Sequence, residues 1–256
     1  EIKSGNTLKF VTQSKSLLLK ISDKEFKSDY FFLNPTAEGN SVEINGKKYR
    51  GTIKIFINNY QIKSVNQISL EDYVKGVMTK EMPLGNGNEN YAALKAFSIC
   101  ARTYAYNKIK EDKDFFDIYP DTRDQVYGGV DGETDITNKI VDETKGQLLF
   151  YDHEPAVMFY HSTCGGYTED AKNVFTQEDI PYLKSIKDGN EPYCKISPRY
   201  EWIENYNEEI FIDRLFTAKL IENKDYQLSN AKVRSRFESG RVNEFEITLR
   251  KSNGEE

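Results

Sequence analysis

Short apolar runs with partial alternation occupy the first third of the chain and predict β-strands. Strands are expected at 8–11, 17–21 and 52–57, where apolar residues recur as a buried or half-buried strand requires. Asn45-Gly46, between two further short runs, is the dipeptide most typical of a two-residue hairpin turn. The N-terminal part of the chain is therefore predicted to be β-rich.

The apolar period changes to that of a helix at Ser69. Ser69 and Asp72 have the spacing of an N-terminal capping box, and Pro83 ends the helical pattern. The apolar positions of this helix are Leu70, Tyr73, Val74, Val77 and Met78. A second helix is predicted over 90–109, and it is apolar on most sides, as a buried central helix is.

The remainder of the chain mixes loops, a short helix and β-structure. Residues 120–132 predict a polar, glycine-containing loop, and 138–144 favour a short helix. A strand pair is predicted at 146–151 and 156–161, and a further strand at 242–249. This mixture predicts an α+β protein.

We expect central helices with β-rich flanking lobes that form a substrate groove. Three parts are predicted: a β-rich N-terminal lobe over 1–66, a catalytic core over 67–190 and a mixed C-terminal lobe over 191–256.

The composition excludes several classes of protein. With 38% hydrophobic and 30% charged residues and no long apolar run, the chain is not expected to span a bilayer. A formal net charge of −6 would repel nucleic acid, so no nucleic-acid partner is expected. The chain begins at Glu1 without the basic and apolar segments of a signal peptide, and we expect an ectodomain trimmed of its N-terminal segment.

Glu81 is the first candidate for catalysis. It follows Val77 by four residues and Met78 by three, so it continues the apolar face of its helix. Partial burial and the negative end of the helix dipole both favour the protonated form that a general acid must hold. The alternative is a glutamate at a frayed helix end in solvent, and periodicity alone leaves the two interpretations open.

Arg102 interrupts the apolar second helix. With Lys95, Ser98 and Tyr106 it forms a polar stripe at spacings of three and four residues. A buried arginine needs an anionic partner, either a carboxylate of the protein or a bound ligand. Because a direct pair with Glu81 would favour the ionised form of that acid, we expect Arg102 to contact the substrate or another carboxylate.

Three cysteines cannot form a complete set of disulfides, so either one thiol is left over or some of the cysteines are metal ligands. His161 and Cys164 end a predicted strand at a glycine turn and are spaced to share a metal, with Cys194 as a third ligand. Cys100 would be a fourth ligand if the second helix passes beneath this turn. Zinc is the metal that such ligands favour. The alternative is a core histidine with three inert thiols.

Four blocks of the sequence resemble the stage II sporulation protein D family, the sporulation lytic transglycosylases. They occur in the family's order and at similar spacing over roughly residues 65–190. The blocks are 69–77 with 81–83, 93–96 with 101–105, 124–129, and 161–166. Cys164 stands where many relatives have a small residue, and Cys100 interrupts an alanine-rich run. These departures are compatible with a zinc site in this member.

The resemblance implies that Glu81 is the catalytic residue and that Arg102, Tyr106, His161 and Ser162 line a substrate groove. The implied activity is cleavage of peptidoglycan glycan strands, preferably stripped of peptides, to 1,6-anhydro-N-acetylmuramyl products during sporulation engulfment. A partner amidase, a membrane protein of the engulfment machinery and an extracytoplasmic, membrane-anchored location are also implied. The chemistry itself requires no cofactor, and zinc would be structural or would organise the site.

Two other functions stay open at this point. The chain could be a non-catalytic wall-binding module that stimulates an amidase, since relatives of this domain are associated with amidase enhancement. It could also be a zinc-dependent cell-wall hydrolase, in which His161, Cys164 and Cys194 hold the metal and Glu81 activates its water.

Overall fold

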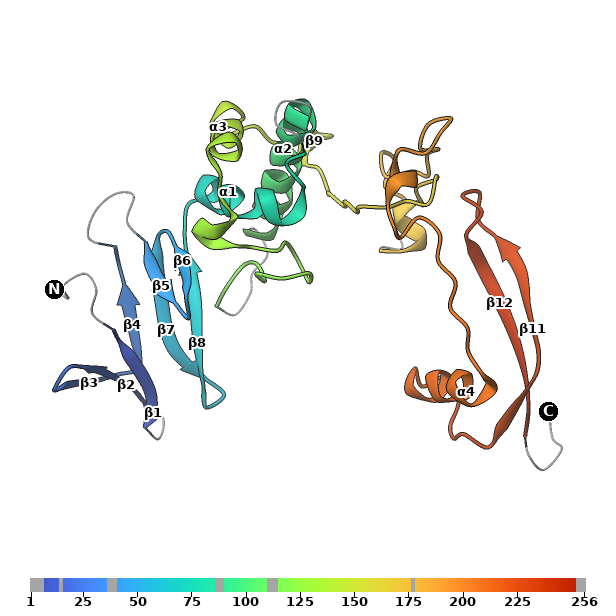
Figure 1. Ribbon diagram of the computed structural model, residues 1–256, viewed down its shortest axis with the longest axis horizontal. Coiled ribbons are helices and arrows are strands. Elements are labelled where there is room, and N and C mark those ends of the chain that lie inside the picture. Colours follow the sequence, from blue (N-terminus) through green and yellow to red (C-terminus); the bar gives the residue numbers. More distant parts are fainter. Residues whose placement is uncertain are drawn as a thin grey trace. The chain divides into compact units, whose positions relative to one another are not determined.

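The computed structural model describes residues 7–13, 16–35, 41–85, 90–109, 115–175 and 178–251. The chain divides into two compact units, residues 1–159 and 160–256, and each is described by itself (Figure 1). The predicted boundaries after residues 66 and 190 each fall inside one unit. Helices and small antiparallel sheets hold 27% and 29% of the residues, which confirms the α+β class.

The first unit begins with small antiparallel sheets that pair neighbouring segments. One sheet has the order β1-β2-β3, a second β4-β7-β8, and a third pairs β5 with β6. These strands are β1 (Lys9–Gln13), β2 (Ser16–Ile21), β3 (Lys24–Ser28), β4 (Tyr30–Leu33), β5 (Val42–Ile44), β6 (Lys47–Tyr49), β7 (Thr52–Asn58) and β8 (Gln61–Gln67). Leu17, Ile53 and Ile55 are buried between them and form a small apolar core.

The predicted Asn45-Gly46 turn is confirmed. Both residues have positive φ, 51° and 79°, as the two central residues of a type I′ turn require, and they join β5 to β6. Strands β3 and β8 are not predicted by the pattern. Their side chains are mostly polar and are exposed or half-buried, so their sequences show no alternation of apolar and polar residues. They form strands by pairing with β2 and β7.

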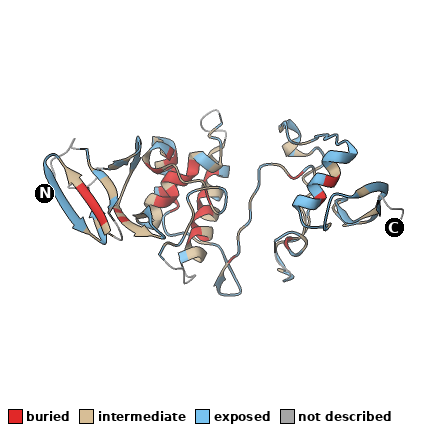
Figure 2. Cartoon of the chain, turned by 90° about the horizontal axis from the view of Figure 1, so that it is seen from below, coloured by how far each residue is buried: buried red, intermediate tan, exposed pale blue. Residues whose placement is uncertain are grey.

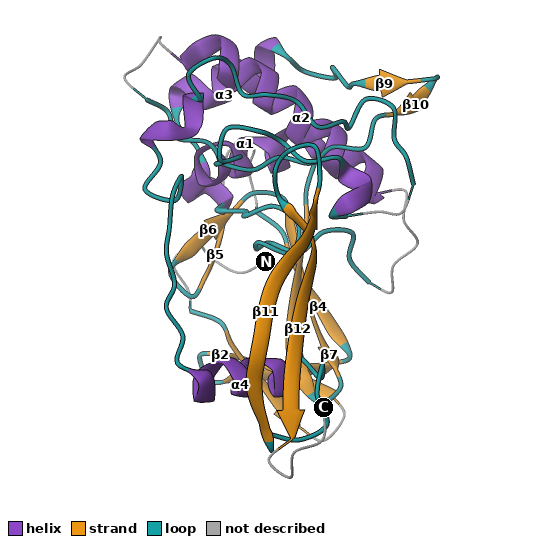
Figure 3. Cartoon of the chain, turned by 90° about the vertical axis from the view of Figure 1, so that its right-hand side faces the viewer, coloured by secondary structure: helices purple, strands orange, loops and turns teal. Residues whose placement is uncertain are grey.

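Three helices follow and contact one another in the first unit (Figure 3). They are α1 (Leu70–Glu81), α2 (Tyr91–Ile109) and α3 (Asp135–Glu143), with the 3-10 helix η2 (Gly129–Gly132) before α3. Figure 2 shows the buried positions gathered along these helices. The core consists of Tyr73, Val74, Val77, Met78, Leu94, Ala101, Ala105, Ile140 and Val141.

Helix α1 has the predicted ends. The side chain of Ser69 accepts a hydrogen bond from the Asp72 amide, which caps the first turn. The helix ends at Glu81, where the Met82 amide donates to the Met78 carbonyl at 3.0 Å, one residue before Pro83. Proline cannot continue a helix, so the sequence itself fixes Glu81 in the last turn.

Helix α2 corrects the expectation of a helix buried nearly all round. Ala92, Ala93 and Ala96 are exposed, whereas Ser98 and Arg102 of the predicted polar stripe are fully buried. Alanine has little apolar surface, so its exposure costs little. The polar residues face the interior because that interior supplies hydrogen-bond partners for them.

The strand pair predicted at 146–151 and 156–161 is mostly wrong. The structure has only β9 (Phe150–Tyr151) and β10 (Glu154–Pro155), and no strand over 156–161. Asp152 and His153 both have positive φ, 49° and 65°. They form a two-residue turn that begins the return strand at Glu154, two residues earlier than expected.

The described part of the second unit consists of loops, two 3-10 helices, one α-helix and a long hairpin; α4, β11 and β12 are labelled in Figure 3. Its elements are η3 (Ala171–Asn173), η4 (Tyr193–Ile196), α4 (Glu208–Thr217), β11 (Tyr226–Arg236) and β12 (Val242–Lys251). The strand predicted at 242–249 is confirmed as β12. None of the described helices combines the length and the apolar composition needed to cross a membrane.

Candidate functional site

The last turn of α1 places Glu81 at the edge of the helical core. Val74, Val77 and Met78 on the same face are fully buried, and Glu81 is half-buried. The helix thus fixes the backbone of Glu81 by its buried face and leaves part of the carboxyl group accessible. A proton-transfer group needs both properties.

A single hydrogen bond holds the Glu81 carboxyl group within the described residues. The Val126 amide donates to Oε1 of Glu81 at 2.5 Å. A backbone donor at this short distance fixes one carboxyl oxygen, and the other has no hydrogen-bond partner among the described residues. No hydrogen bond or ion pair joins Glu81 to Arg102 or to another carboxylate among these residues.

Val126 belongs to the segment predicted as a polar loop, and residues 119–129 are held to the helices of the first unit. The Asp124 carboxylate accepts from the Tyr104 hydroxyl at 2.7 Å and from the Tyr119 amide at 2.8 Å. Lys108 of α2 lies 3.6 Å from the same carboxylate. The loop is therefore fastened to α2.

The loop is also packed closely on α1. The Gly128 amide donates to the Gly76 carbonyl at 2.9 Å, and the Tyr127 ring stacks on Tyr73 with centroids 5.2 Å apart. A Cβ atom at Gly76 would lie 2.4 Å from the Tyr127 ring, so only glycine allows this approach. Burial raises the pKa of the Tyr127 hydroxyl, as does the nearby Glu133 carboxylate.

Arg102 contacts another carboxylate, one of its two predicted partners. Its guanidinium group is fully buried and donates from Nε to Glu71 at 3.0 Å and from Nη2 at 2.8 Å. It also donates to the Val141 carbonyl at 3.2 Å and the Gln147 carbonyl at 3.3 Å. With no exposed side-chain surface, Arg102 has a structural role here, and this geometry lends no support to a direct contact with substrate.

The other predicted groove residues lie in different parts of the chain. Tyr106 is half-buried on α2, one turn beyond Arg102. His161 and Ser162 are exposed at the start of the second unit. Their contribution to a groove shared with Glu81 stays a prediction.

Comparison with known proteins matches part of the chain to a family. Residues 58–151 match the family described as SpoIID, stage II sporulation protein. This matched segment is called the SpoIID domain below, and it is what the chain shares with that family. It contains Glu81, Arg102, Tyr106 and the 119–129 loop.

Curated relatives match beyond this domain. Stage II sporulation protein D of Bacillus subtilis is 33% identical over 60% of this chain and 47% of its own length. The amidase enhancer of Bacillus subtilis is 39% identical over 60% of this chain and 21% of its own. An uncharacterized protein of Brachyspira hyodysenteriae is 34% identical over 56% and 38%. The chain thus spans less than half the length of these relatives. No solved structure matches it.

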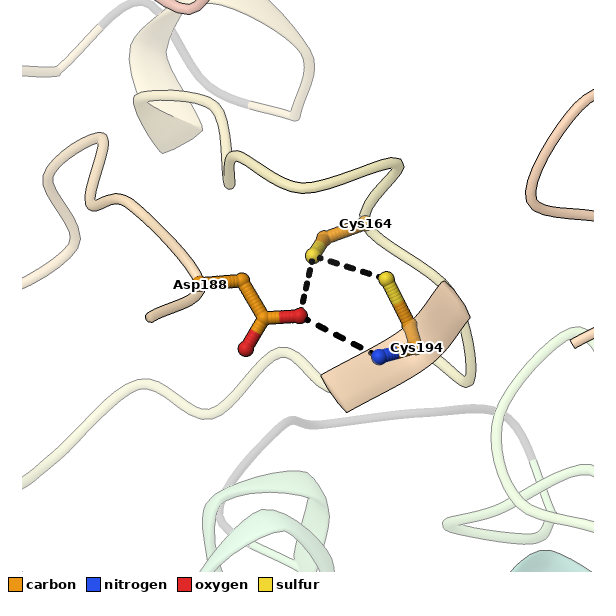
Figure 4. Close-up of side chains that lie close together, drawn as sticks. All are labelled: Cys164, Asp188 and Cys194. Atoms are coloured by element: carbon orange, nitrogen blue, oxygen red, sulfur yellow. Dashed lines mark hydrogen bonds between the residues drawn. The ribbon is translucent and has the colours of Figure 1, made fainter. Parts of the chain in front are cut away.

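A cysteine site lies after the SpoIID domain, in the second unit (Figure 4). The Sγ atoms of Cys164 and Cys194 are 3.4 Å apart, and Cys164 Sγ is 3.3 Å from Asp188 Oδ2. The Cys194 amide donates to the same oxygen at 3.3 Å. These three side chains present ligand atoms within 4.8 Å of one another, close enough to share one metal ion.

This ligand set differs from the predicted one in one member. Cys164 and Cys194 are brought together as expected, but His161 lies exposed outside the group and Asp188 takes the third place. Cys100 lies on α2 in the first unit. The sequence does not indicate Asp188 as a ligand, because no spacing pattern links a lone aspartate to a cysteine 24 residues before it and another six residues after it.

Within the group, Asp188 is the side chain whose charged form is favoured. Burial acts to raise the pKa of Asp188, but hydrogen bonds from Cys164 and Cys194 outweigh it and lower that pKa below its usual value. Burial raises the pKa of the Cys164 thiol, as does the neighbouring Cys194. Two sulfur ligands and one carboxylate oxygen are a donor set that zinc accepts.

Proposed function

We propose that this protein is a lytic transglycosylase that cleaves peptidoglycan glycan strands, with Glu81 as the catalytic acid and base. The observation that carries this proposal is the setting of Glu81. Glu81 is half-buried at a fixed helix end, and one carboxyl oxygen is held by the Val126 amide. The relatives named for sporulation and amidase enhancement support a role at the cell wall.

The hydrogen bond from the Val126 amide gives the two carboxyl oxygens of Glu81 different roles. Oε1 accepts the amide in both protonation states, so Oε2 carries the proton. Glu81 donates this proton to the glycosidic oxygen as the bond to C1 breaks. The carboxylate then takes the proton of the C6 hydroxyl of the N-acetylmuramyl ring as that oxygen bonds to C1. The product is a 1,6-anhydro sugar, and no water is consumed.

The face of α1 that carries Glu81 has no second carboxylate beside it in the sequence, and this favours the transglycosylase route over hydrolysis. Most glycosidases place a second carboxyl group about 5–10 Å from the acid, to act as nucleophile or to activate water. Glu71, the carboxylate shared with Arg102, lies at the opposite end of α1. A nucleophile supplied by the substrate removes the need for a second carboxylate, and its positioning supplies much of the rate.

Product analysis tests the proposal. Glycan strands stripped of peptides are incubated with the wild type, Glu81→Gln and Glu43→Gln, and the new ends are identified by mass spectrometry. Glu43, exposed on β5, is the matched control. We expect anhydro-muramyl ends from the wild type and the control, and a loss of about 100-fold or more in Glu81→Gln, as for other general acids. Reducing ends that contain added water would contradict the proposal.

The amidase-enhancer relative favours a second candidate function. A wall-binding module would bind glycan and stimulate a partner amidase without cleaving strands. Binding and stimulation that are equal in the wild type and Glu81→Gln, with no anhydro ends from either, would establish this alternative. Under both functions we propose an amidase and a membrane protein as partners, and an extracytoplasmic, membrane-anchored location.

We further propose that Cys164, Asp188 and Cys194 hold a zinc ion that organises the second unit. Metal analysis of the purified chain should give about one zinc per chain, as a structural site of this donor type does. Asp188→Asn should lower this content, and Asp179→Asn, an exposed aspartate of the same unit, should not. The zinc-hydrolase alternative predicts water-added products that disappear on chelation, so the product analysis above also decides it.

A further inference from the structure

We propose that Gln125 is a positioning residue for Glu81: it fixes the loop peptide whose amide holds the catalytic carboxyl group. Its consequence for glycan cleavage rests on the proposed function, but the positioning itself does not. Gln125 belongs to a segment, 120–132, that the sequence pattern leaves as a polar loop without a role.

Gln125 is held from two helices. The Tyr73 hydroxyl of α1 donates to its side-chain oxygen at 3.1 Å, and its side-chain nitrogen donates to the Ala101 carbonyl of α2 at 3.4 Å. The residue is fully buried, and it is the one fully buried side chain in the segment 119–128. A buried amide is tolerated only when its donor and acceptor are both paired, so the side chain has little freedom to shift.

The covalent geometry carries this restraint to the acid. The Gln125 carbonyl and the Val126 amide share one planar peptide group, so fixing Gln125 restricts the direction of the Val126 N–H bond. That bond points at Glu81 Oε1, 2.5 Å away. On the other side, the Tyr127 amide donates to the Pro120 carbonyl at 3.1 Å and closes the loop.

The contacts of the neighbouring residues do not replace this restraint. Asp124, the residue before Gln125, contacts α2 through Tyr104 and Lys108. Gln125 alone joins the loop to α1 and α2 together through a buried side chain. Without it, the Val126 amide is free to turn from Glu81, and the carboxyl group loses the partner that orients it for proton transfer.

The Val126 amide proton gives a direct readout by nuclear magnetic resonance of the full chain. Its resonance is followed against pH in the wild type, Glu81→Gln, Gln125→Leu and Gln61→Leu. Gln61, exposed on β8, is the matched control. A hydrogen bond to an ionised acceptor is stronger than one to a neutral group, so the wild-type resonance should move as Glu81 ionises. Glu81→Gln separates this response from that of the adjacent Asp124.

We expect the pH response of the Val126 amide to disappear in Glu81→Gln, to fall at least twofold in Gln125→Leu, and to remain unchanged in Gln61→Leu. A full wild-type response in a folded Gln125→Leu would overturn the inference. If Gln125→Leu does not fold, Tyr73→Phe removes only the hydroxyl that donates to Gln125, and an unchanged response there would overturn it equally.

The catalytic consequence is measured separately. In Gln125→Leu the turnover of stripped glycan should fall about tenfold with little change in KM, because a positioning defect acts on the reacting geometry and not on strand binding. A wild type that shows the amide response but cleaves no glycan would refute the proposed function and leave the positioning role intact. A wild type that cleaves glycan, beside a Gln125 variant with normal amide response and turnover, would refute the positioning role alone.

Discussion

The surroundings of Glu81 and those of the Cys164–Asp188–Cys194 group are stabilised in different ways. Nine buried apolar residues from three helices form one core behind Glu81. In the described part of the second unit only Cys164, Ala171, Ile212 and Leu215 are buried. The first site depends on packing, whereas the second lies on loops and the 3-10 helix η4, with little core. Regions with small cores commonly need a metal or a disulfide to hold them together.

Loss of a metal ligand should have the largest effect, and it should be confined to the second unit. In Cys194→Ser we expect residues 160–251 to lose protection from amide hydrogen exchange, because metal binding in small sites supplies about 10 kcal/mol or more of folding free energy. Residues 70–109 should keep their protection. Chelation of the wild type should reproduce this pattern. If the second unit stays protected from exchange in both experiments, the proposed dependence of this unit on a metal ion is wrong.

Cys100→Ser is the companion variant in the first unit. An unchanged zinc content would exclude the predicted fourth ligand, and a reduced content would establish it.

The buried pair of Arg102 and Glu71 gives the next largest effect. Arg102→Met leaves Glu71 without its cation, and we expect the first unit to lose about 3–5 kcal/mol in urea unfolding, as when one partner of a buried pair is removed. Adding Glu71→Leu should recover part of this loss. Arg123→Met, which breaks an exposed pair with Asp121, is the control and should change little. Unchanged stability with weakened glycan binding would instead favour a direct substrate contact.

The close approach of the 119–129 loop to α1 should respond to a single methyl group. Gly76→Ala places a Cβ atom against Tyr127, and we expect a loss of about 1–3 kcal/mol from overpacking. Helix propensity alone predicts the opposite sign, a gain of about 1 kcal/mol. Thermal unfolding of the variant therefore distinguishes packing from propensity.

The smallest expected effect is a dependence of stability on alkaline pH. Burial raises the pKa of Tyr127 in the folded chain above the value of 10.0 that it has when unfolded. As the pH rises, the unfolded chain therefore loses the Tyr127 proton before the folded chain does. Tyr127 contributes to the free energy of unfolding below pH 10, and this contribution declines as the pH rises above 10. In Tyr127→Phe the decline should be shallower in unfolding experiments between about pH 9 and 11. An equal slope in both proteins would show that Tyr127 does not contribute.

The sequence predicted the helices that carry Glu81 and Arg102 because their signals are local. Ser69, Pro83 and the apolar period of α1 act within a few residues of one another. The burial of Ser98 and Arg102 on α2 could not be predicted in the same way. It depends on Glu71 and Thr144, which the fold brings to them from 31 and 46 positions away.

The same limit applies to both candidate sites. The half-buried position of Glu81 follows from its helix, but the Val126 amide reaches it from 45 positions away. Two of the three members of the cysteine group were predicted from residue type. Asp188 joins them through loop geometry, for which the sequence has no periodic signal.

Helix α1 is fastened at both ends, to Arg102 through Glu71 and to the 119–129 loop through Glu81. The two glutamates are separated by ten residues, or about 15 Å of rigid helix. Such a rod cannot bend its last turn toward a ligand or fray away from one. Glu81 therefore keeps the position that the fold gives it, and under the proposed function a bound strand would have to distort its own sugar ring to reach the proton. Discrimination between strands would then depend on how easily each sugar distorts.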